Sequence, residues 1–312
     1  MIVGSIRSGL VEAVHPVVAA AVTRSGRVIA VVGNDSDRPF FYRSAVKPLQ
    51  AAVAVRRGAG LEPEQLALAA ASHGGQPVHV AIVTRMLRDA GLDASHLRCP
   101  PDWPSNVDAG RRLAAEGHVE NPLFHNCSGK HAAMLRACAA QGWSLEYTPA
   151  NHPLQQDVIA LASEATGASV VPTGVDGCGV PTLRGDVLGL ARAFARIVSD
   201  PELRPIAENS ARFTALTSDG DRAEAVLARW FPGVVKGGAM GCIGAGWLEG
   251  GIGLAAKSWS GHSPAAVVGL IALMARLGLL ADHPRHQLEE LAAPAVLGGG
   301  LPVGSLEVLS IQ

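Results

Sequence analysis

The stretch YRSAVKPLQ, at positions 42–50, follows two apolar segments that predict strands and begins a segment that predicts a helix. Ser44 and Lys47 within it are three positions apart, so on a helix they lie on one face. A lysine close to a serine, if burial or a nearby positive charge keeps it neutral, can take the hydroxyl proton and create a nucleophile. Serine is also a preferred first residue of a helix, and lysine is common on solvated helix surfaces, so this spacing alone leaves both interpretations open.

The order of the predicted elements favours one sheet built from both ends of the chain. Residues 17–22 and 27–32 predict a hairpin near the N-terminus, and residues 253–259 and 306–311 predict strands near the C-terminus. Most of the predicted helices lie between them. We therefore expect an α/β fold of the α+β type, with an antiparallel or mixed sheet and segregated flanking helices. No stretch has the composition of a linker, so residues 1–312 are predicted to form a single catalytic unit.

Apolar periodicity, prolines at helix starts and glycines at helix ends mark the other elements. Helices are predicted at residues 44–57, 63–71, 77–90, 109–115, 129–140, 153–165, 186–197, 202–216, 222–230 and 264–279. Short strands are predicted at residues 39–42 and 169–173. Residues 237–253 are rich in glycine, and no regular element is predicted before the strand that starts at residue 253.

The composition predicts a globular protein without a strongly charged partner. The chain has 312 residues, of which 48% are hydrophobic and 17% charged, and its net charge is -1. No basic stripe indicates nucleic-acid binding. The N-terminal residues lack the pattern of a signal peptide, and the longest apolar run, residues 265–275, is too short to cross a bilayer. We expect a cytoplasmic protein with neither a membrane nor a nucleic-acid partner.

The cysteines are too few, and odd in number, for a disulfide framework. The five are Cys99, Cys127, Cys138, Cys178 and Cys242. In a reducing compartment they are free thiols or metal ligands. The apolar helix face around Cys138 and the prolines beside Cys99 indicate buried thiols, and the role of Cys242 stays open.

Residues 126–131, NCSGKH, place a thiol, a hydroxyl, an amine and an imidazole at the start of a predicted helix. A thiolate there would be stabilised by the helix N-terminus and by Lys130. Although Gly-Lys precedes the helix, this stretch is not a P-loop. The upstream glycine that the motif requires is replaced by Phe124.

The same stretch provides half of a candidate metal site. Cys127 with His131, or with Lys130, forms one half, and Asp176 with Cys178, in a glycine-rich turn, forms the other. Cysteine and histidine are ligands that suit Zn²⁺. No C-x-x-C pair is present, so small buried cysteines are the alternative interpretation.

Two further groups are candidates for the wall of a pocket. Residues 72–75, SHGG, end a predicted helix and can present the Ser72 hydroxyl to a site, or they form an ordinary helix end with His73 on the surface. Lys257 lies in an otherwise apolar strand. Such a lysine usually lies at a sheet edge or faces solvent, whereas one that points into a pocket is a candidate for a lowered pKa.

Four stretches taken together resemble the asparaginase II family, the zinc-containing type that uses Ser-Lys pairs. They are residues 43–50, 71–74, 126–131 and 174–181, and the resemblance covers nearly the whole chain. It implies a fold similar to that of serine β-lactamases and bacterial glutaminases, with the strand of Lys257 in the place of their K-T-G strand. It also implies a homodimer.

The resemblance assigns roles that the residues alone leave open. It implies two catalytic pairs, Ser44 with Lys47 and Ser72 with Lys257. The implied zinc ligands are Cys127, Lys130 and Cys178, together with a water. The candidates for binding the substrate are Arg43, His73, His131 and Asp176.

The expected reaction is the hydrolysis of L-asparagine to L-aspartate and ammonia. Ser44 would attack the side-chain amide carbon with Lys47 as its base, and Ser72 and Lys257 would support proton transfer, although the sequence does not decide which pair supplies the nucleophile. Zinc would orient the α-amino and carboxylate groups of the substrate. Two alternatives stay open. One is a glutaminase or another serine acyl hydrolase on the same scaffold, and the other is a zinc-binding protein without activity.

Overall fold

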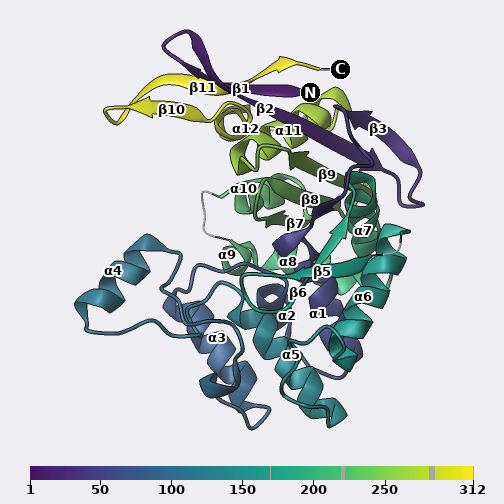
Figure 1. Ribbon diagram of the computed structural model, residues 1–312, viewed down its shortest axis with the longest axis vertical. Coiled ribbons are helices and arrows are strands. Elements are labelled where there is room, and N and C mark those ends of the chain that lie inside the picture. The colour runs from purple at the N-terminus through teal and green to yellow at the C-terminus, as the bar shows by residue number, and fades with distance from the viewer. Residues whose placement is uncertain (169, 219–221, 281–284, 312) are drawn as a thin grey trace.

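Strands from both ends of the chain form the larger of two sheets in the computed structural model, which describes residues 1–312 except 169, 219–221, 281–284 and 312 (Figure 1). Its strands are β1 (Ile2–Arg7), β2 (Leu10–Val22), β3 (Val28–Val32), β7 (Gly233–Gly238), β8 (Cys242–Trp247), β9 (Ile252–Ser258), β10 (Ala295–Gly298) and β11 (Leu301–Ser310). The order is β10-β11-β1-β2-β9-β8-β7, with β3 also paired to β2. Every pairing is antiparallel, which confirms the prediction of an antiparallel sheet built from both chain ends.

Strands β2 and β9 connect the two ends of the chain. Val17 pairs with Ser258, and the register continues without a shift to Val22 and Gly253. Alternate residues of this part of β2 enter two different cores: Val18, Ala20 and Val22 enter one, and Val17, Ala19 and Ala21 enter the other. Because both faces of the strand are buried, its sequence is continuously apolar rather than alternating.

Helices cover both faces of this sheet. They are α1 (Lys47–Arg56), α2 (Pro63–Ala69), α3 (Pro77–Arg88), α4 (Val107–Ala115), α5 (Ser128–Gln141), α6 (Pro153–Thr166), α7 (Val187–Ser199), α8 (Arg204–Arg212), α9 (Thr214–Thr217), α10 (Ala223–Trp230), α11 (Ser263–Arg276) and α12 (Arg285–Ala292). Helix α7 packs on one face and α11 on the opposite face, while α1 to α6 form a separate helical region below the sheet in Figure 1. Among the helices that the structure describes, none is long and apolar enough to cross a membrane.

A smaller sheet lies between the helical region and the main sheet (Figure 1). It has the order β4 (Phe40–Phe41), β6 (Pro181–Gly185), β5 (Val171–Val175). Strand β4 leads directly into the Ser44 turn, and the β5–β6 connection carries Asp176 and Cys178. This sheet therefore brings two distant parts of the sequence to the same place.

The glycine-rich residues 237–253 contribute to three strands, contrary to the expectation that no regular element lies there. Glycine is needed because α7 packs directly on this part of the sheet. A Cβ at Gly244 would lie 2.1 Å from the ring of Phe194, and one at Gly253 would lie 2.0 Å from the carbonyl oxygen of Ala191. Glycine normally weakens a strand, so the local composition concealed β7 and β8.

Other boundaries also differ from the prediction. Residues 202–216 form α8 and α9 instead of one helix, and the sequence does not predict β1, β6, β10 or α12. The strand predicted at residues 169–173 corresponds to β5, and residue 169 lies outside the described residues. Helices α3, α5, α6 and α11 lie close to their predicted ranges.

Candidate active site

Ser44 lies in a tight turn between the small sheet and α1. Residues Arg43–Val46 form a 3-10 helix, and Val46 is the N-terminal cap residue of α1, which begins at Lys47. The prediction of one continuous helix from residue 44 is therefore wrong, because the 3-10 turn precedes α1. Ser44 does not cap α1 and lines a cavity instead. Arg43 has a φ of 51°, a left-handed conformation that costs a residue with a Cβ about 1–2 kcal/mol. Backbone strain thus lies directly beside the candidate nucleophile.

The amine of Lys47 is buried between two oxygen atoms. Its Nζ donates to Ser72 Oγ at 2.8 Å and to the carbonyl oxygen of Asn126 at 3.2 Å, and the residue is 1% exposed. Burial is the main reason why the pKa of Lys47 is lowered. Among the residues that the structure describes, no hydrogen bond joins Lys47 to Ser44, so the serine in direct contact with this amine is Ser72.

Ser72 is fixed by the segment that follows α2. The backbone N–H of His73 donates to the carbonyl oxygen of Asn126 at 3.2 Å, and His73 Nε2 lies 3.0 Å from Ser128 Oγ. His73 is fully buried, and burial holds its pKa well below the usual range, so the ring is neutral. The side chain of His73 therefore braces the Ser72 segment against the start of α5 instead of lying on the surface.

Lys257 makes different contacts from those that the resemblance implies. Its Nζ donates to the carbonyl oxygen of Met240, and it lies 5.7 Å from the ring centroid of Phe40 and 5.8 Å from that of Trp259. No hydrogen bond to Ser72 is found in the described part of the chain. The hydroxyl of Ser72 is bonded by Lys47 instead.

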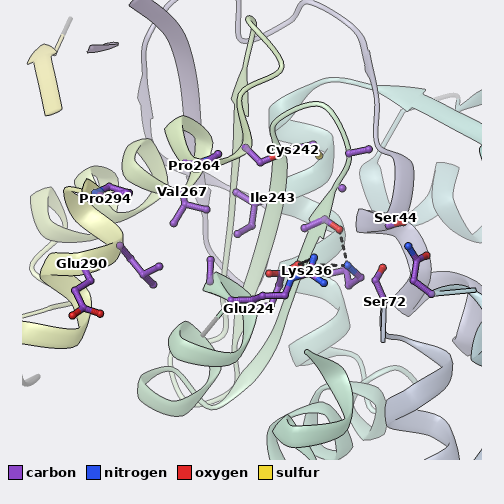
Figure 2. A pocket seen from close by; sticks show the side chains of 18 residues that line it. Ser44, Ser72, Glu224, Lys236, Cys242, Ile243, Pro264, Val267, Glu290 and Pro294 are labelled. Carbon is purple, nitrogen blue, oxygen red and sulfur yellow. Dashed lines mark hydrogen bonds and ion pairs between the residues drawn. The ribbon is translucent and has the colours of Figure 1, made fainter. Parts of the chain in front are cut away.

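The two serines open into one cavity of about 490 Å³ (Figure 2). Ser44, Ser72, Asn126 and Lys236 supply polar atoms to its wall. Figure 2 shows Ser44 and Ser72 at one side of the cavity and Glu290 and Pro294 at the other. Two candidate nucleophiles and one lysine, Lys236, are thus placed around a space that is large enough for a small substrate.

Lys236 is a residue of the site that the sequence reasoning missed. It lies on β7, is 3% exposed, and its Nζ donates to the carbonyl oxygen of Gly237 at 2.6 Å. A Cβ at Gly238 would lie 2.4 Å from the carbonyl oxygen of Tyr42, so this glycine lets β7 approach the Ser44 turn. The sequence signal that could have indicated Lys236 is Lys-Gly-Gly at positions 236–238, which shares the lysine and the final glycine of the K-T-G motif.

The thiols of Cys127 and Cys178 lie next to the buried Lys47. Cys127 is the cap residue of α5, and Lys130 Nζ, in the first turn of that helix, donates to Cys178 Sγ at 3.0 Å. The pKa of Cys127 is held well below its usual range, mainly by hydrogen bonding with Cys178. Burial acts in the opposite direction, but the positive charges of Lys47 and Lys130 lower the pKa further. The structure therefore brings together two residues from α5 and one from the β5–β6 turn.

These three residues fit a zinc ion by their chemistry, because thiolates and a nitrogen donor are ligands that Zn²⁺ prefers. Among the described residues, no group of three or more His, Cys, Asp and Glu side chains could hold a metal ion. The nitrogen ligand that the resemblance implies is Lys130, whose Nζ donates to Cys178 Sγ at 3.0 Å.

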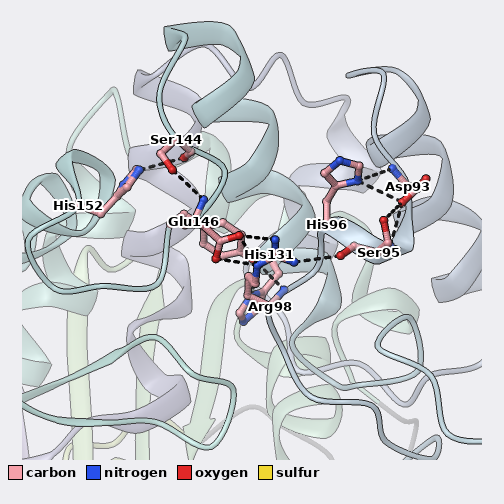
Figure 3. Close-up of polar contacts among 9 residues, drawn as sticks. Asp93, Ser95, His96, Arg98, His131, Ser144, Glu146 and His152 are labelled. Atoms are coloured by element: carbon pink, nitrogen blue, oxygen red, sulfur yellow. Dashed lines mark hydrogen bonds and ion pairs between the residues drawn. The ribbon is translucent and has the colours of Figure 1, made fainter.

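His131 and part of the polar network around it are shown in Figure 3. Its Nδ1 lies 2.6 Å from the hydroxyl of Tyr147, which accepts the backbone N–H of Arg98 at 3.0 Å. The Arg98 side chain also donates to Ser95 and to the carboxylate of Glu146. Burial lowers the pKa of His131 to about 4, so the ring is neutral and acts as a structural support for α5.

Asp176 connects the β5–β6 turn to the Ser44 turn. Its Oδ1 accepts the Nε–H of Arg43 at 2.6 Å and the backbone N–H of Gly177 at 2.8 Å. The side chain of Asp176 is 14% exposed and that of Arg43 is 30% exposed. The ion pair holds Arg43 beside Ser44.

Cys242, whose role the sequence left open, also borders the cavity. Burial raises its pKa to about 12, so the thiol stays protonated. Its Sγ lies 3.7 Å from the carbonyl oxygen of Tyr42, in the segment that precedes Ser44. We assign it to the packing of β8 against the Ser44 turn.

Comparisons with known proteins agree with this description. The chain matches the L-asparaginase II family over residues 3–308. No curated protein sequence is significantly similar to it. Among solved structures, Mglu in its glutamate form is 17% identical with a TM-score of 0.49, and the match covers 86% of this chain and 62% of that chain. This chain therefore spans less than two thirds of the length of Mglu.

Two smaller proteins give similar matches. A beta-lactamase from Mycobacterium bovis is 14% identical, with a TM-score of 0.40, over 86% of this chain and 94% of that chain. A Streptomyces DD-transpeptidase variant is 14% identical, with a TM-score of 0.41, over 84% of this chain and 96% of that chain.

The family match extends over nearly the whole chain. The chain therefore belongs to the L-asparaginase II family.

Proposed function

We propose that the protein is an L-asparaginase that hydrolyses L-asparagine to L-aspartate and ammonia through an acyl-enzyme. The observation that carries this proposal is the hydrogen bond of 2.8 Å from Lys47 Nζ to Ser72 Oγ, at the wall of a cavity that Ser44 also lines. A buried amine bonded to a hydroxyl is suited to general-base activation of serine. Membership of the L-asparaginase II family supports the choice of substrate.

In the proposed mechanism, Ser44 Oγ attacks the side-chain amide carbon of L-asparagine. Its proton passes through the Ser72 hydroxyl to Lys47 Nζ. When the C–N bond breaks, Lys47 returns a proton to the leaving nitrogen, and ammonia departs. Water then hydrolyses the Ser44 ester by the same groups, which releases L-aspartate and restores the hydroxyl. Backbone N–H groups in the Ser44 turn are the proposed donors to the oxyanion.

Zinc is part of the proposal, with Cys127, Lys130 and Cys178 as its ligands. When bound, the ion would supply positive charge that orients the polar groups of the substrate. The role of these three residues is thus to hold that charge close to the Ser72 segment, since Cys127 follows Asn126, whose carbonyl oxygen accepts from Lys47.

Removal of zinc should raise KM for L-asparagine more than it lowers kcat, because the ion is proposed to bind substrate and not to create the nucleophile. The measurement is steady-state ammonia release before and after chelation, with the metal content determined on the same samples. Cys178→Ser should give the same change without a chelator. An unchanged KM in a sample verified to be free of zinc would contradict this role.

The proposed reaction is tested by ammonia release from L-asparagine, L-glutamine and D-asparagine, with wild type and Ser44→Ala compared. We expect activity on L-asparagine that the substitution abolishes. Preference for L-glutamine would support the alternative of a glutaminase. No activity on any amide in the zinc-loaded protein would exclude the proposed function. The homodimer that the resemblance implies stays a prediction, which sedimentation of the same sample checks.

A further inference from the structure

A carboxylate lies between two cations at the sheet-edge wall of the cavity. Glu224 Oε1, from α10, is 3.8 Å from Lys236 Nζ on β7 and 3.8 Å from Arg222 Nη2. The side chain of Glu224 is 12% exposed and that of Lys236 is 4% exposed. All three residues line the cavity that contains Ser44 and Ser72 (Figure 2). The mechanism proposed above uses none of them.

The backbone of β7 is shaped to receive this carboxylate. A Cβ at Gly237 would lie 2.7 Å from Glu224 Oε1, so a side chain at this position would make the carboxylate shift from the place that it occupies. The Glu224 carboxylate accepts the backbone N–H of Gly237, while Lys236 Nζ donates to the Gly237 carbonyl oxygen at 2.6 Å. Two polar contacts to one glycine therefore fix the carboxylate and the amine relative to each other.

The charges around Lys236 show what the carboxylate does. The groups that act on its amine are Glu224, Lys47, Arg222 and Cys127, with Cys242 on the neighbouring strand. Burial lowers the pKa of Lys236 to about 8, and Glu224 is the main group that opposes the fall, whereas Lys47 and Arg222 add to it. Burial disfavours the ionised form of Glu224, but Lys236 and Arg222 hold its pKa below the usual value. Without Glu224, Lys236 would lose its proton more readily.

We propose that Glu224 is a positioning residue that keeps Lys236 cationic and fixed at the cavity wall, where Lys236 and Arg222 receive the carboxylate of an α-amino acid amide. One carboxylate between two cations leaves a net positive charge, which attracts an anionic group of the substrate. The binding step rests on the proposed function, because it takes L-asparagine as the substrate. The effect of Glu224 on Lys236 does not depend on any reaction.

The first experiment measures Lys236 directly. The rate of acetylation of Lys236 by acetic anhydride is followed against pH by mass spectrometry in wild type, Glu224→Gln and Glu224→Asp. We expect the titration of Lys236 to move to lower pH by on the order of one unit in Glu224→Gln and to be partly restored in Glu224→Asp. Glu208→Gln is the control, since Glu208 forms an exposed pair with Arg204. Superimposable profiles for wild type and Glu224→Gln would overturn the proposal.

The second experiment measures substrate binding. For Glu224→Gln at pH 8, KM for L-asparagine should rise by roughly fivefold, with a smaller change in kcat, because fewer molecules carry the cation. The KM of wild type should rise above about pH 8, and that of the variant from a lower pH. A fall in kcat at unchanged KM would contradict the carboxylate role.

Gly237→Ala provides a second variant in case Glu224→Gln does not fold. Its added methyl group must displace the Glu224 carboxylate, so the titration of Lys236 should move in the same direction as in Glu224→Gln. An unchanged titration in a folded Gly237→Ala would count against the proposal. If wild type has no activity on amides, the proposed function fails, but the acetylation profiles still decide whether Glu224 controls Lys236.

Discussion

Two buried lysines lie at the cavity wall or directly behind it, and their surroundings differ in one respect. Lys236 lines the cavity, whereas Lys47 is bonded to Ser72, which lines it. Lys47, on α1, donates to a serine hydroxyl and a backbone carbonyl oxygen, and its other close neighbours are thiols and a lysine. Lys236, on β7, has a carboxylate 3.8 Å away. Burial lowers the pKa of both amines.

The comparison indicates how one site can hold a base and a cation of the same residue type. A buried lysine bonded to a hydroxyl is suited to accept a proton, whereas one paired with a carboxylate is better suited to keep its charge. Under the proposed function, the helical wall would carry out proton transfer, and the sheet-edge wall would supply the charge that binds substrate.

Of the substitutions that test this difference between the two lysines, we expect the largest loss of activity from replacing Lys47. Lys47→Met should lower kcat by about 10²–10⁴-fold, the usual contribution of a general base, while Lys257→Met should stay within about tenfold of wild type. Lys257 is bonded to the carbonyl oxygen of Met240 and not to Ser72, which is why the two variants should differ. Both are assayed by ammonia release after circular dichroism has verified the fold. A larger loss in Lys257→Met would restore the pairing of Ser72 with Lys257.

A smaller effect is expected from Lys236, whose titration should make the free energy of unfolding depend on pH. Its pKa is about 8 in the folded protein and 10.5 ordinarily, so between these values the unfolded chain binds more protons than the folded one. The free energy of unfolding therefore rises with pH across this window, by up to about 3 kcal/mol from this residue. The contribution is complete above the unfolded pKa and is lost as pH falls through 8.

Urea unfolding of wild type and Lys236→Met at several pH values checks this sign. The stability of wild type relative to the variant should increase from pH 7 towards pH 10. If the free energy of unfolding changed with pH in the same way in both proteins, the pKa of Lys236 would be the same in the folded and unfolded chain. The result would contradict the lowered pKa of Lys236.

Much of the fold could be predicted because the strands near both chain ends and the long helices have strong apolar patterns. The motifs also predicted that Ser44, Lys47, Cys127 and Cys178 gather at one place. Strands β7 and β8 could not be recognised, because their glycines are required by the approach of α7, a contact between residues far apart in the sequence.

The same cause explains the missed part of the site. Lys236 lies in β7, a strand that the sequence did not predict, and it precedes two glycines. Lys257, in contrast, lies in a segment with a clear apolar strand pattern. The effect of Glu224 on Lys236 depends on the packing of α10 against β7. The direct contact between Lys47 and Ser72 depends on how the segment after α2 meets α1. Neither contact leaves a signal in sequence spacing.

The most direct test of the account is to find which serine carries the acyl group. Wild type is mixed with L-asparagine, quenched in acid during turnover, digested and examined by mass spectrometry, with Ser44→Ala and Ser72→Ala in parallel. The account predicts an aspartyl ester on the peptide that contains Ser44, absent from Ser44→Ala and reduced in Ser72→Ala. An ester on Ser72, with Ser44→Ala still active, would contradict it and would make the serine bonded to Lys47 the nucleophile.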